Sequence, residues 1–194
     1  MYELPTSIII NDKEYPIRNK GDYRTIINII DVTGDPELNS NEIMAVVIIM
    51  FYENVNTISD IYYTFPDIQE AYNQVMKFIS LNNSEVGQKT EHKMIDWVQD
   101  ENLIVSAINN VAHTEIRALP YLHWWTFIGY YMSIGECSLA TVVSIRSKIA
   151  EGRKLDKSEQ RFRKNNPQYF VWERDLQKNK QLLDSIWNQE SRKE

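Results

Sequence analysis

The chain has 194 residues, of which 43% are hydrophobic, 25% charged and 11% aromatic, with six glycines, six prolines and one cysteine. This composition predicts a globular protein with a sizeable core, and it excludes disordered, fibrous and disulfide-stabilised classes. The net charge of −6 argues against a protein whose whole surface coats nucleic acid, and the longest apolar run, Ile43 to Tyr52, is too short to span a bilayer.

The N-terminal residues predict a β-hairpin. Thr6 to Ile10 is rich in residues that favour strands, Asn11 to Lys13 supplies turn residues, and Glu14 to Ile17 forms the returning strand. Pro16 restricts that second strand to an edge of the sheet. Because an isolated hairpin is only marginally stable, we expect it to pack against helices.

Helical spacing of apolar residues begins after the hairpin. Asp22 is the expected N-cap of a helix that ends near Gly34. Ser40 or Asn41 is the expected N-cap of the next helix, which contains the apolar run from Ile43 to Tyr52. The length of that run favours a buried helix over a buried strand.

A third helix and a loop complete the first half. Pro66, followed by acidic residues, is expected to open a helix that extends to about Ile79. The stretch from Asn82 to Lys93 is polar and contains a glycine, so it is predicted to be a loop and an internal boundary.

The second half predicts further helices. Two are expected to start at Asp100 and at Pro120, and a third is expected to have Ser138 as its N-cap and to end before Gly152. An amphipathic segment follows Pro167. The predicted fold is therefore mainly α, with about six to eight helices and a small N-terminal β-hairpin. We expect residues 1–81, 95–165 and 166–194 to be its three parts, together forming one compact unit.

Motifs that carry catalysis are absent from the sequence. It has no glycine-rich phosphate loop, no Gly-x-Ser-x-Gly and no His-Glu-x-x-His. The cluster of Asp96, Asp100 and Glu101 is better explained by helix capping than by acid–base chemistry, and Cys137 lacks a nucleophile signature. We therefore expect no catalytic site, no metal site and no cofactor.

An aromatic segment from Leu119 to Met132 is the first candidate for partner binding. On a helix, one broad face would be formed by Tyr121, Trp124, Trp125, Ile128 and Met132. Large aromatic side chains are frequent at the centres of interfaces, although a face of this kind more often belongs to a core. Both interpretations stay open at the level of the sequence.

A basic segment is the second candidate. The range from Arg146 to Lys164 contains eight basic and three acidic residues. Residues 144–194 carry a net charge of +5, against −11 for residues 1–143. The candidate contacts with an acidic partner are Arg146, Arg153, Lys154 and Arg161. A solvated helix face and a nucleic-acid contact are the alternatives.

An ordered set of residues resembles one protein family. It consists of Leu122-His123-Trp124-Trp125-x-Phe127, then Glu136, then Ile145-Arg146-x-Lys148-Ile149-Ala150, then Gly152-x-x-Leu155. The earlier Ile95-Asp96-Trp97-x-x-Asp100-Glu101-x-Leu103-Ile104 also fits. The chain resembles the tail-assembly protein of phages and prophages of Gram-positive bacteria, which is encoded between the tail-tube and tape-measure genes. The similarity is best over residues 95–165 and looser over residues 1–94.

That resemblance implies a non-enzymatic tail assembly chaperone in the cytoplasm of the bacterial host. Its expected partner is the tape-measure protein, which it would keep soluble during virion morphogenesis. The tail-tube protein and further copies of the same chain are additional expected partners, and membrane binding is not expected. The alternatives are a structural tail component of the virion and a helical nucleic-acid-binding protein that uses residues 146–164.

Overall fold

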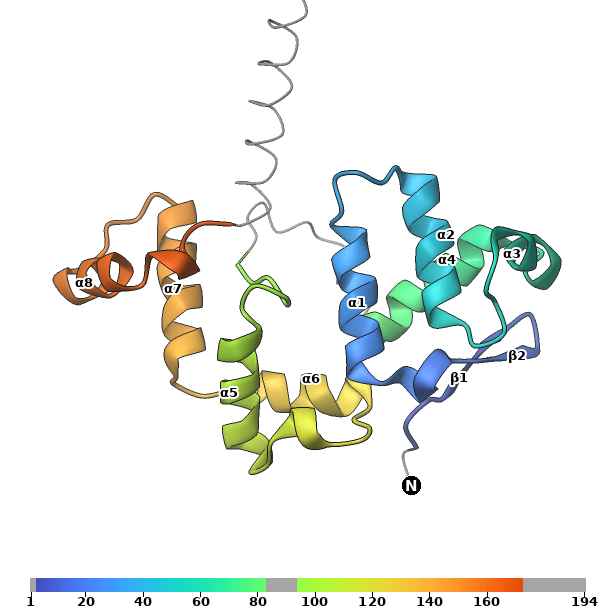
Figure 1. Ribbon diagram of the computed structural model, residues 1–194, viewed down its shortest axis with the longest axis horizontal. Helices are drawn as coiled ribbons and strands as arrows, with labels where there is room; N and C mark the ends of the chain where they lie inside the picture. The colour runs from blue at the N-terminus through green and yellow to red at the C-terminus, as the bar shows by residue number, and fades with distance from the viewer. Residues whose placement is uncertain (1–2, 83–93, 173–194) are drawn as a thin grey trace, which may run out of the picture. The chain divides into compact units, whose positions relative to one another are not determined.

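The computed structural model of the protein describes residues 3–82 and 94–172 (Figure 1). The described residues form two compact units. Unit 1 contains residues 3–82 and 105–134, and unit 2 contains residues 94–104 and 135–172. Eight α-helices and one two-stranded antiparallel sheet make up the described residues, which confirms the predicted mainly α fold with an N-terminal hairpin.

The hairpin pairs β1 (Ser7–Ile10) with β2 (Lys13–Pro16). Asn11 and Asp12 form the two-residue turn with φ angles of 50° and 60°, a left-handed conformation that Asn and Asp tolerate better than most residues. The hairpin packs on helix α4 (Ile68–Ile79), as its marginal stability requires.

Helices α1 (Tyr23–Thr33) and α2 (Ser40–Phe51) follow, and α1 has the expected N-cap Asp22 and C-cap Gly34. The N-cap of α2 is Asn39, so the prediction of Ser40 or Asn41 was wrong. The Asn39 side chain accepts hydrogen bonds from the backbone N–H groups of Asn41 and Glu42, and the Glu42 carboxylate accepts the N–H of Asn39. Asn39 is the position that has a glutamate three residues later, which is what this reciprocal capping requires.

A further short helix lies between α2 and α4. Helix α3 (Ile58–Thr64) was not predicted, although Thr57 and Asp60 cap it reciprocally. Helix α4 (Ile68–Ile79) starts at the N-cap Asp67, one residue after the proline that was expected to open it. A seven-residue helix has too few turns to show a clear apolar period, which explains why α3 escaped the sequence analysis.

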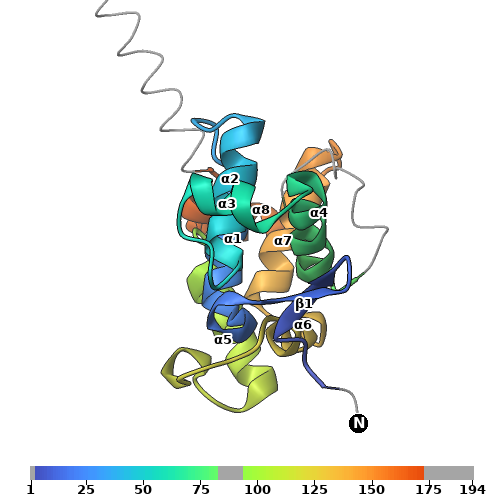
Figure 2. The ribbon, with the colours of Figure 1, turned by 90° about the vertical axis from the view of Figure 1, so that its right-hand side faces the viewer.

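The core of unit 1 lies between α1, α2, α4 and α6 (Trp124–Met132), with the hairpin at one side (Figures 1 and 2). The largest side chains that are fully buried in it include Phe51, Tyr52, Phe78, Trp124 and Phe127. The N-cap of α6 is His123, so the expected start at Pro120 was wrong; the short 3₁₀-helix η2 (Ile116–Ala118) precedes it.

Unit 2 is built on α7 (Ser138–Ala150) and α8 (Lys157–Asn165), followed by the 3₁₀-helix η3 (Pro167–Tyr169). Cys137, not the expected Ser138, caps α7, because its sulfur accepts the N–H of Ala140 at 3.5 Å. The turn after α7 contains Gly152 with a φ of +67°. The boundary between the two units falls within α5 (Glu101–Ala112).

Two predicted segments lie partly outside the described residues. They are most of the loop expected from Asn82 to Lys93 and most of the amphipathic segment expected after Pro167. Among the helices of the described ranges, none combines the length and apolar character that crossing a bilayer demands.

Candidate partner-binding surfaces

The aromatic face of α6 lies largely inside unit 1. Trp124 is 2% exposed and Ile128 is 7% exposed, whereas Trp125 is half-buried. Tyr121 and Met132, at the two ends of the face, are exposed, although the Tyr121 hydroxyl donates to the carbonyl of Lys20. The structure therefore places the centre of this face in the core and only its ends at the surface.

The two tryptophans attach α6 to the C-terminal end of α4. The indole N–H of Trp124 donates to the Ile79 carbonyl, and that of Trp125 donates to the Phe78 carbonyl, each at 2.9 Å. The last carbonyls of a helix have no partner within the helix. The Trp124 bond supplies a partner for the Ile79 carbonyl, whereas the Phe78 carbonyl accepts the backbone N–H of Leu81 in addition to the Trp125 indole. This arrangement gives the Trp-Trp pair of the sequence a structural role.

His123 holds the other side of the same junction. Its Nδ1 accepts the backbone N–H of Trp125 at 3.0 Å, so the neutral ring carries its proton on Nε2, which donates to the carbonyl of Pro5. Burial lowers the pKa of His123 below its ordinary value, while the bond to Pro5 acts in the opposite direction. The neutral imidazole is therefore the form that caps α6.

Arg146, predicted to contact a partner, lies inside unit 2. Its guanidinium forms a bidentate ion pair with Asp100, with side-chain exposures of 5% and 0%. It also donates to the carbonyls of Met94 and Tyr169, and it stacks on the Trp172 ring at 4.2 Å from the centroid. Arg146 thus ties α7 to the chain segments before α5 and after α8, and its charge is neutralised within the unit.

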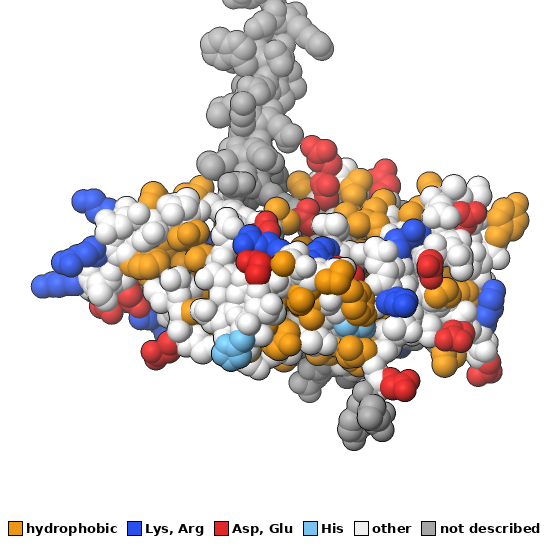
Figure 3. Space-filling model, turned by 60° about the horizontal axis from the view of Figure 1, so that its bottom comes forward, with side chains coloured by type: hydrophobic (Ala, Val, Ile, Leu, Met, Phe, Trp, Pro, Cys, Tyr) orange, Lys and Arg blue, Asp and Glu red, His pale blue; other side chains and the backbone are white. Residues whose placement is uncertain are grey.

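The other predicted basic residues are at the surface. Arg153 forms an exposed ion pair with Glu151, and Lys154 and Arg161 are also exposed. We call the exposed cations of the α7–α8 turn and of α8 the basic stripe; they are Arg153, Lys154, Lys157, Arg161, Arg163 and Lys164. Figure 3 shows Lys and Arg side chains gathered over this end of unit 2.

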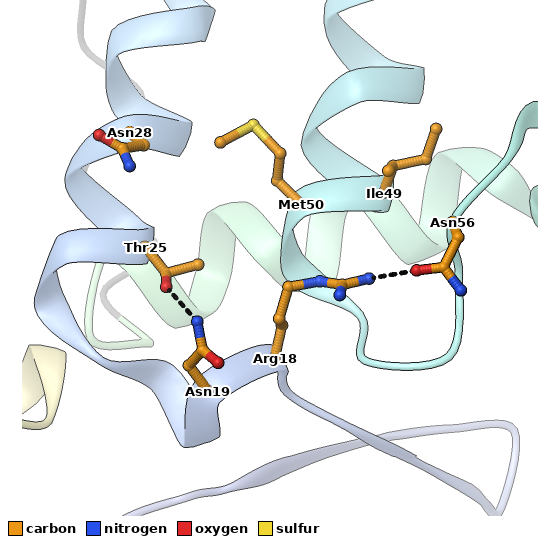
Figure 4. Close-up of a pocket in the computed structure, with 7 residues that line it drawn as sticks. All are labelled: Arg18, Asn19, Thr25, Asn28, Ile49, Met50 and Asn56. Atoms are coloured by element: carbon orange, nitrogen blue, oxygen red, sulfur yellow. Dashed lines mark hydrogen bonds between the residues drawn. The ribbon is translucent and has the colours of Figure 1, made fainter. Parts of the chain in front are cut away.

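A depression in unit 1 escaped the sequence analysis altogether. It is an open hollow of about 290 Å³ between α1 and α2, lined by Arg18, Asn19, Thr25, Asn28, Ile49, Met50 and Asn56 (Figure 4). Met50 and Ile49 supply an apolar wall, and three amides, a hydroxyl and a guanidinium surround it. No short motif marks the hollow, because its residues come from three segments that only the fold brings together.

Arg18 is placed in this hollow by a strained turn. Asn19, Lys20 and Gly21 have φ angles of 50°, 53° and 74°, and a Cβ on Gly21 would lie 2.8 Å from the Phe78 ring. One terminal nitrogen of Arg18 donates to the carbonyls of Tyr52 and Val55 and to the Asn56 side chain. No carboxylate of the described residues pairs with Arg18, so the hollow carries a positive charge.

Helix α2 forms the apolar border of the depression. Every residue from Ile43 to Phe51 is hydrophobic, but only Val47, Ile48 and Phe51 are buried. Ile49 and Met50 remain partly exposed on another side. A helix that is apolar on all sides is normally covered on all sides, whereas α2 keeps a partly exposed apolar side.

The carboxylate cluster near the start of α5 has structural roles. Asp96 accepts the backbone N–H groups of Val98 and Gln99, and Asp100 pairs with Arg146. In the part of the chain that the structure describes, no group of three His, Cys, Asp or Glu side chains is arranged to hold a metal ion.

Comparison with known protein families gives one match. The family model described as Bacteriophage Gp15 protein matches residues 1–170. The chain belongs to this family. Searches of curated proteins and of solved structures found no match.

Membership in the Gp15 family confirms the phage origin that the motif resemblance indicated. The matched range includes both units and all described helices and strands, from β1 to η3. The similarity therefore extends well beyond the range 95–165 in which the sequence motifs are strongest. The basic stripe and the depression both lie within the matched range.

Proposed function

We propose that this Gp15-family protein is a non-enzymatic tail assembly chaperone that binds the phage tape-measure protein in the host cytoplasm. The proposal combines the family membership with the resemblance to tail-assembly proteins. A tape-measure protein is a long helical chain with apolar seams, and such seams associate wrongly unless they are covered. A chaperone for it needs a surface that accepts an apolar helix face.

The partly exposed side of α2, next to the depression, is the observation that supports this function best. Ile49 and Met50 offer an apolar wall, and the polar rim provides hydrogen bonds that fix the register of a bound helix. The volume of about 290 Å³ is at the lower end of small-molecule sites, which run from about 300 to 1,000 Å³. It suits one or two anchoring side chains of a partner helix better than a cofactor.

The test is co-expression of the tape-measure protein with an Ile49→Glu variant. A carboxylate on the apolar wall of the depression is expected to abolish co-purification and to leave the tape-measure protein insoluble. Ile9→Glu is the matched control, because Ile9 is 69% exposed on β1, away from the depression. Retained binding by a folded Ile49→Glu protein would remove α2 from the proposed site.

A second measurement separates a chaperone from a structural tail component. Mass spectrometry of purified virions is expected to find no peptides of this chain, because a chaperone leaves before the tail is complete. Its presence at a fixed copy number would instead identify a component of the particle. Substitution of Trp124 is unsuitable as a binding test, because its burial means that Trp124→Ala would act on folding first.

A further inference from the structure

The depression between α1 and α2 contains a cation whose hydrogen-bonding groups are only partly used. Arg18 makes three hydrogen bonds, all from Nη2, to the carbonyls of Tyr52 and Val55 and to Oδ1 of Asn56. Its Nε is buried without a hydrogen-bond partner, and its Nη1 donates to none of the described residues. Because Arg18 lines the depression, Nη1 is available to an acceptor that enters there (Figure 4).

The groups that contact Arg18 do not neutralise its charge. Two of them are backbone carbonyls and the third is an amide oxygen, and such groups carry only partial negative charges. The carboxylate that contacts Asn56 is that of Asp60, which accepts the backbone N–H groups of Asn56 and Thr57 in the cap of α3. The complementary ligand for Arg18 is therefore a fully charged anion, and a carboxylate fits the geometry of a guanidinium.

The α1 side of the depression adds further donors. Asn28 is exposed, and its side-chain amide makes no hydrogen bond within the described ranges. The amide of Asn19 donates to the Thr25 hydroxyl and has a second N–H. An ionised carboxylate only accepts hydrogen bonds, so amide N–H groups beside a guanidinium suit it.

The apolar wall of the depression continues along α2. Ile43, Val46 and Met50 follow one another at spacings of three and four residues, which puts them on one face of the helix, and all three are partly exposed. Figure 4 shows Met50 on α2 and Asn28 on α1 at opposite sides of the depression. A helix that lies along α2 can therefore cover this apolar face and reach Arg18 at the same time.

We propose that the depression selects a partner helix by its carboxylate. An Asp or Glu of the partner accepts a hydrogen bond from Nη1 of Arg18, and an apolar residue three or four positions away packs on Met50. Side chains at that spacing are neighbours, with Cβ atoms about 5–6 Å apart, so both can enter one depression. This inference rests on the proposed function, because it specifies which helices of the tape-measure protein bind. A helix with Lys or Arg in place of the acid is rejected by charge repulsion.

Substitutions of Asn28 test the charge preference without removing Arg18, whose bonds also hold the chain after α2. Asn28→Asp adds a negative charge to the depression, and Asn28→Lys adds a second positive charge. The side chain is exposed on α1 and makes no hydrogen bond to the described residues, so both variants are expected to fold. Asn110→Asp and Asn110→Lys are the matched controls, because Asn110 is an exposed asparagine of α5 that does not line the depression.

Isothermal titration of the full chain with overlapping fragments of the tape-measure protein of the same phage gives the readout. Asn28→Asp is expected to bind its fragment about tenfold more weakly than the wild type, and Asn28→Lys about threefold more tightly. The controls are expected to stay within about twofold of the wild type. Replacing the critical acid of the fragment with Gln should weaken binding to the wild type much more than binding to Asn28→Asp, because the two changes act on one contact.

The outcomes separate this inference from the function on which it rests. A wild type that binds no fragment would overturn both. A fragment that binds the wild type and both Asn28 variants with equal affinity would leave the chaperone function standing and overturn the role of the carboxylate. Tighter binding by Asn28→Asp would assign a basic side chain to the depression instead, and an equal loss in Asn110→Asp would reduce the effect to the net charge of the protein. Either result would also overturn the inference.

Discussion

His123 is the side chain whose chemistry the structure defines most sharply. Its burial, its acceptance of the Trp125 N–H and its bond to Pro5 together require the neutral ring. Because burial holds the pKa of His123 below its ordinary value, the unfolded chain binds this proton more readily than the folded chain. Stability contributed by neutral His123 is therefore complete above the unfolded pKa, 6.5, and is lost as the pH falls below it.

A His123→Asn variant tests this residue. Asparagine keeps an acceptor for the Trp125 N–H but does not titrate. Between pH 7.5 and pH 5.5 the free energy of unfolding of the wild type is expected to fall more steeply than that of the variant. Urea unfolding at each pH measures the difference, and titration of other histidines cancels in the comparison. Parallel pH profiles for the two proteins would contradict the assignment.

Arg146 shows why single residues were harder to assign than elements. In the sequence, Arg146 belongs to a segment, residues 146–164, that contains eight basic residues, and a position at the surface is the natural interpretation of such a segment. Its partners Asp100, Met94, Tyr169 and Trp172 lie 23 or more residues away along the chain, and their approach is a consequence of the tertiary fold. Periodicity and capping report on neighbours within a few positions, so they carry no information about such a pair.

At the scale of elements, local signals were sufficient for most of the chain. The hairpin, α1, α2, α4, α5 and α7 begin within a few residues of their predicted starts, because caps and apolar spacing are properties of short stretches. The start of α6 was predicted wrongly because it depends on a residue far away in the sequence. Pro120 is a common helix opener, but the chain stays extended up to His123, whose ring is fixed as a cap by the distant carbonyl of Pro5.

The cap of α2 gives a prediction at the scale of an element. Asn39→Ala removes the acceptor of two backbone N–H groups and is expected to lower the free energy of unfolding by about 1 kcal/mol. Asn39→Asp should retain most of that stability, since aspartate caps equally well. Ser40→Ala is the matched control and should leave the urea midpoint nearly unchanged. A larger loss at position 40 than at position 39 would contradict the reciprocal cap.

At the scale of the whole molecule, the motif residues and the candidate partner-binding surfaces are different parts of the chain. Trp124, Trp125 and Arg146, which make the sequence recognisable, hold helices together inside the two units. The candidate partner-binding surfaces are formed by less distinctive residues, the apolar side of α2 and the cations of α8. The motif residues therefore indicated a phage protein family, and the sequence also indicated cations of the basic stripe, whereas the depression could be found only from the fold.

Because the chain forms two units, we expect a destabilising substitution in unit 2 to have little effect on the stability of unit 1. Arg146→Met leaves Asp100 buried without its ion pair and is expected to cost about 3–5 kcal/mol in unit 2. Because each unit has its own buried residues, amide hydrogen exchange should accelerate in α7 and α8 and change little in α1, α2 and α4. Arg153→Met is the control, since its ion pair with Glu151 is half exposed and such pairs contribute at most about 1 kcal/mol. Equal acceleration of exchange throughout unit 1 would show that the chain unfolds as a single cooperative body, and the independence of the two cores would then be wrong.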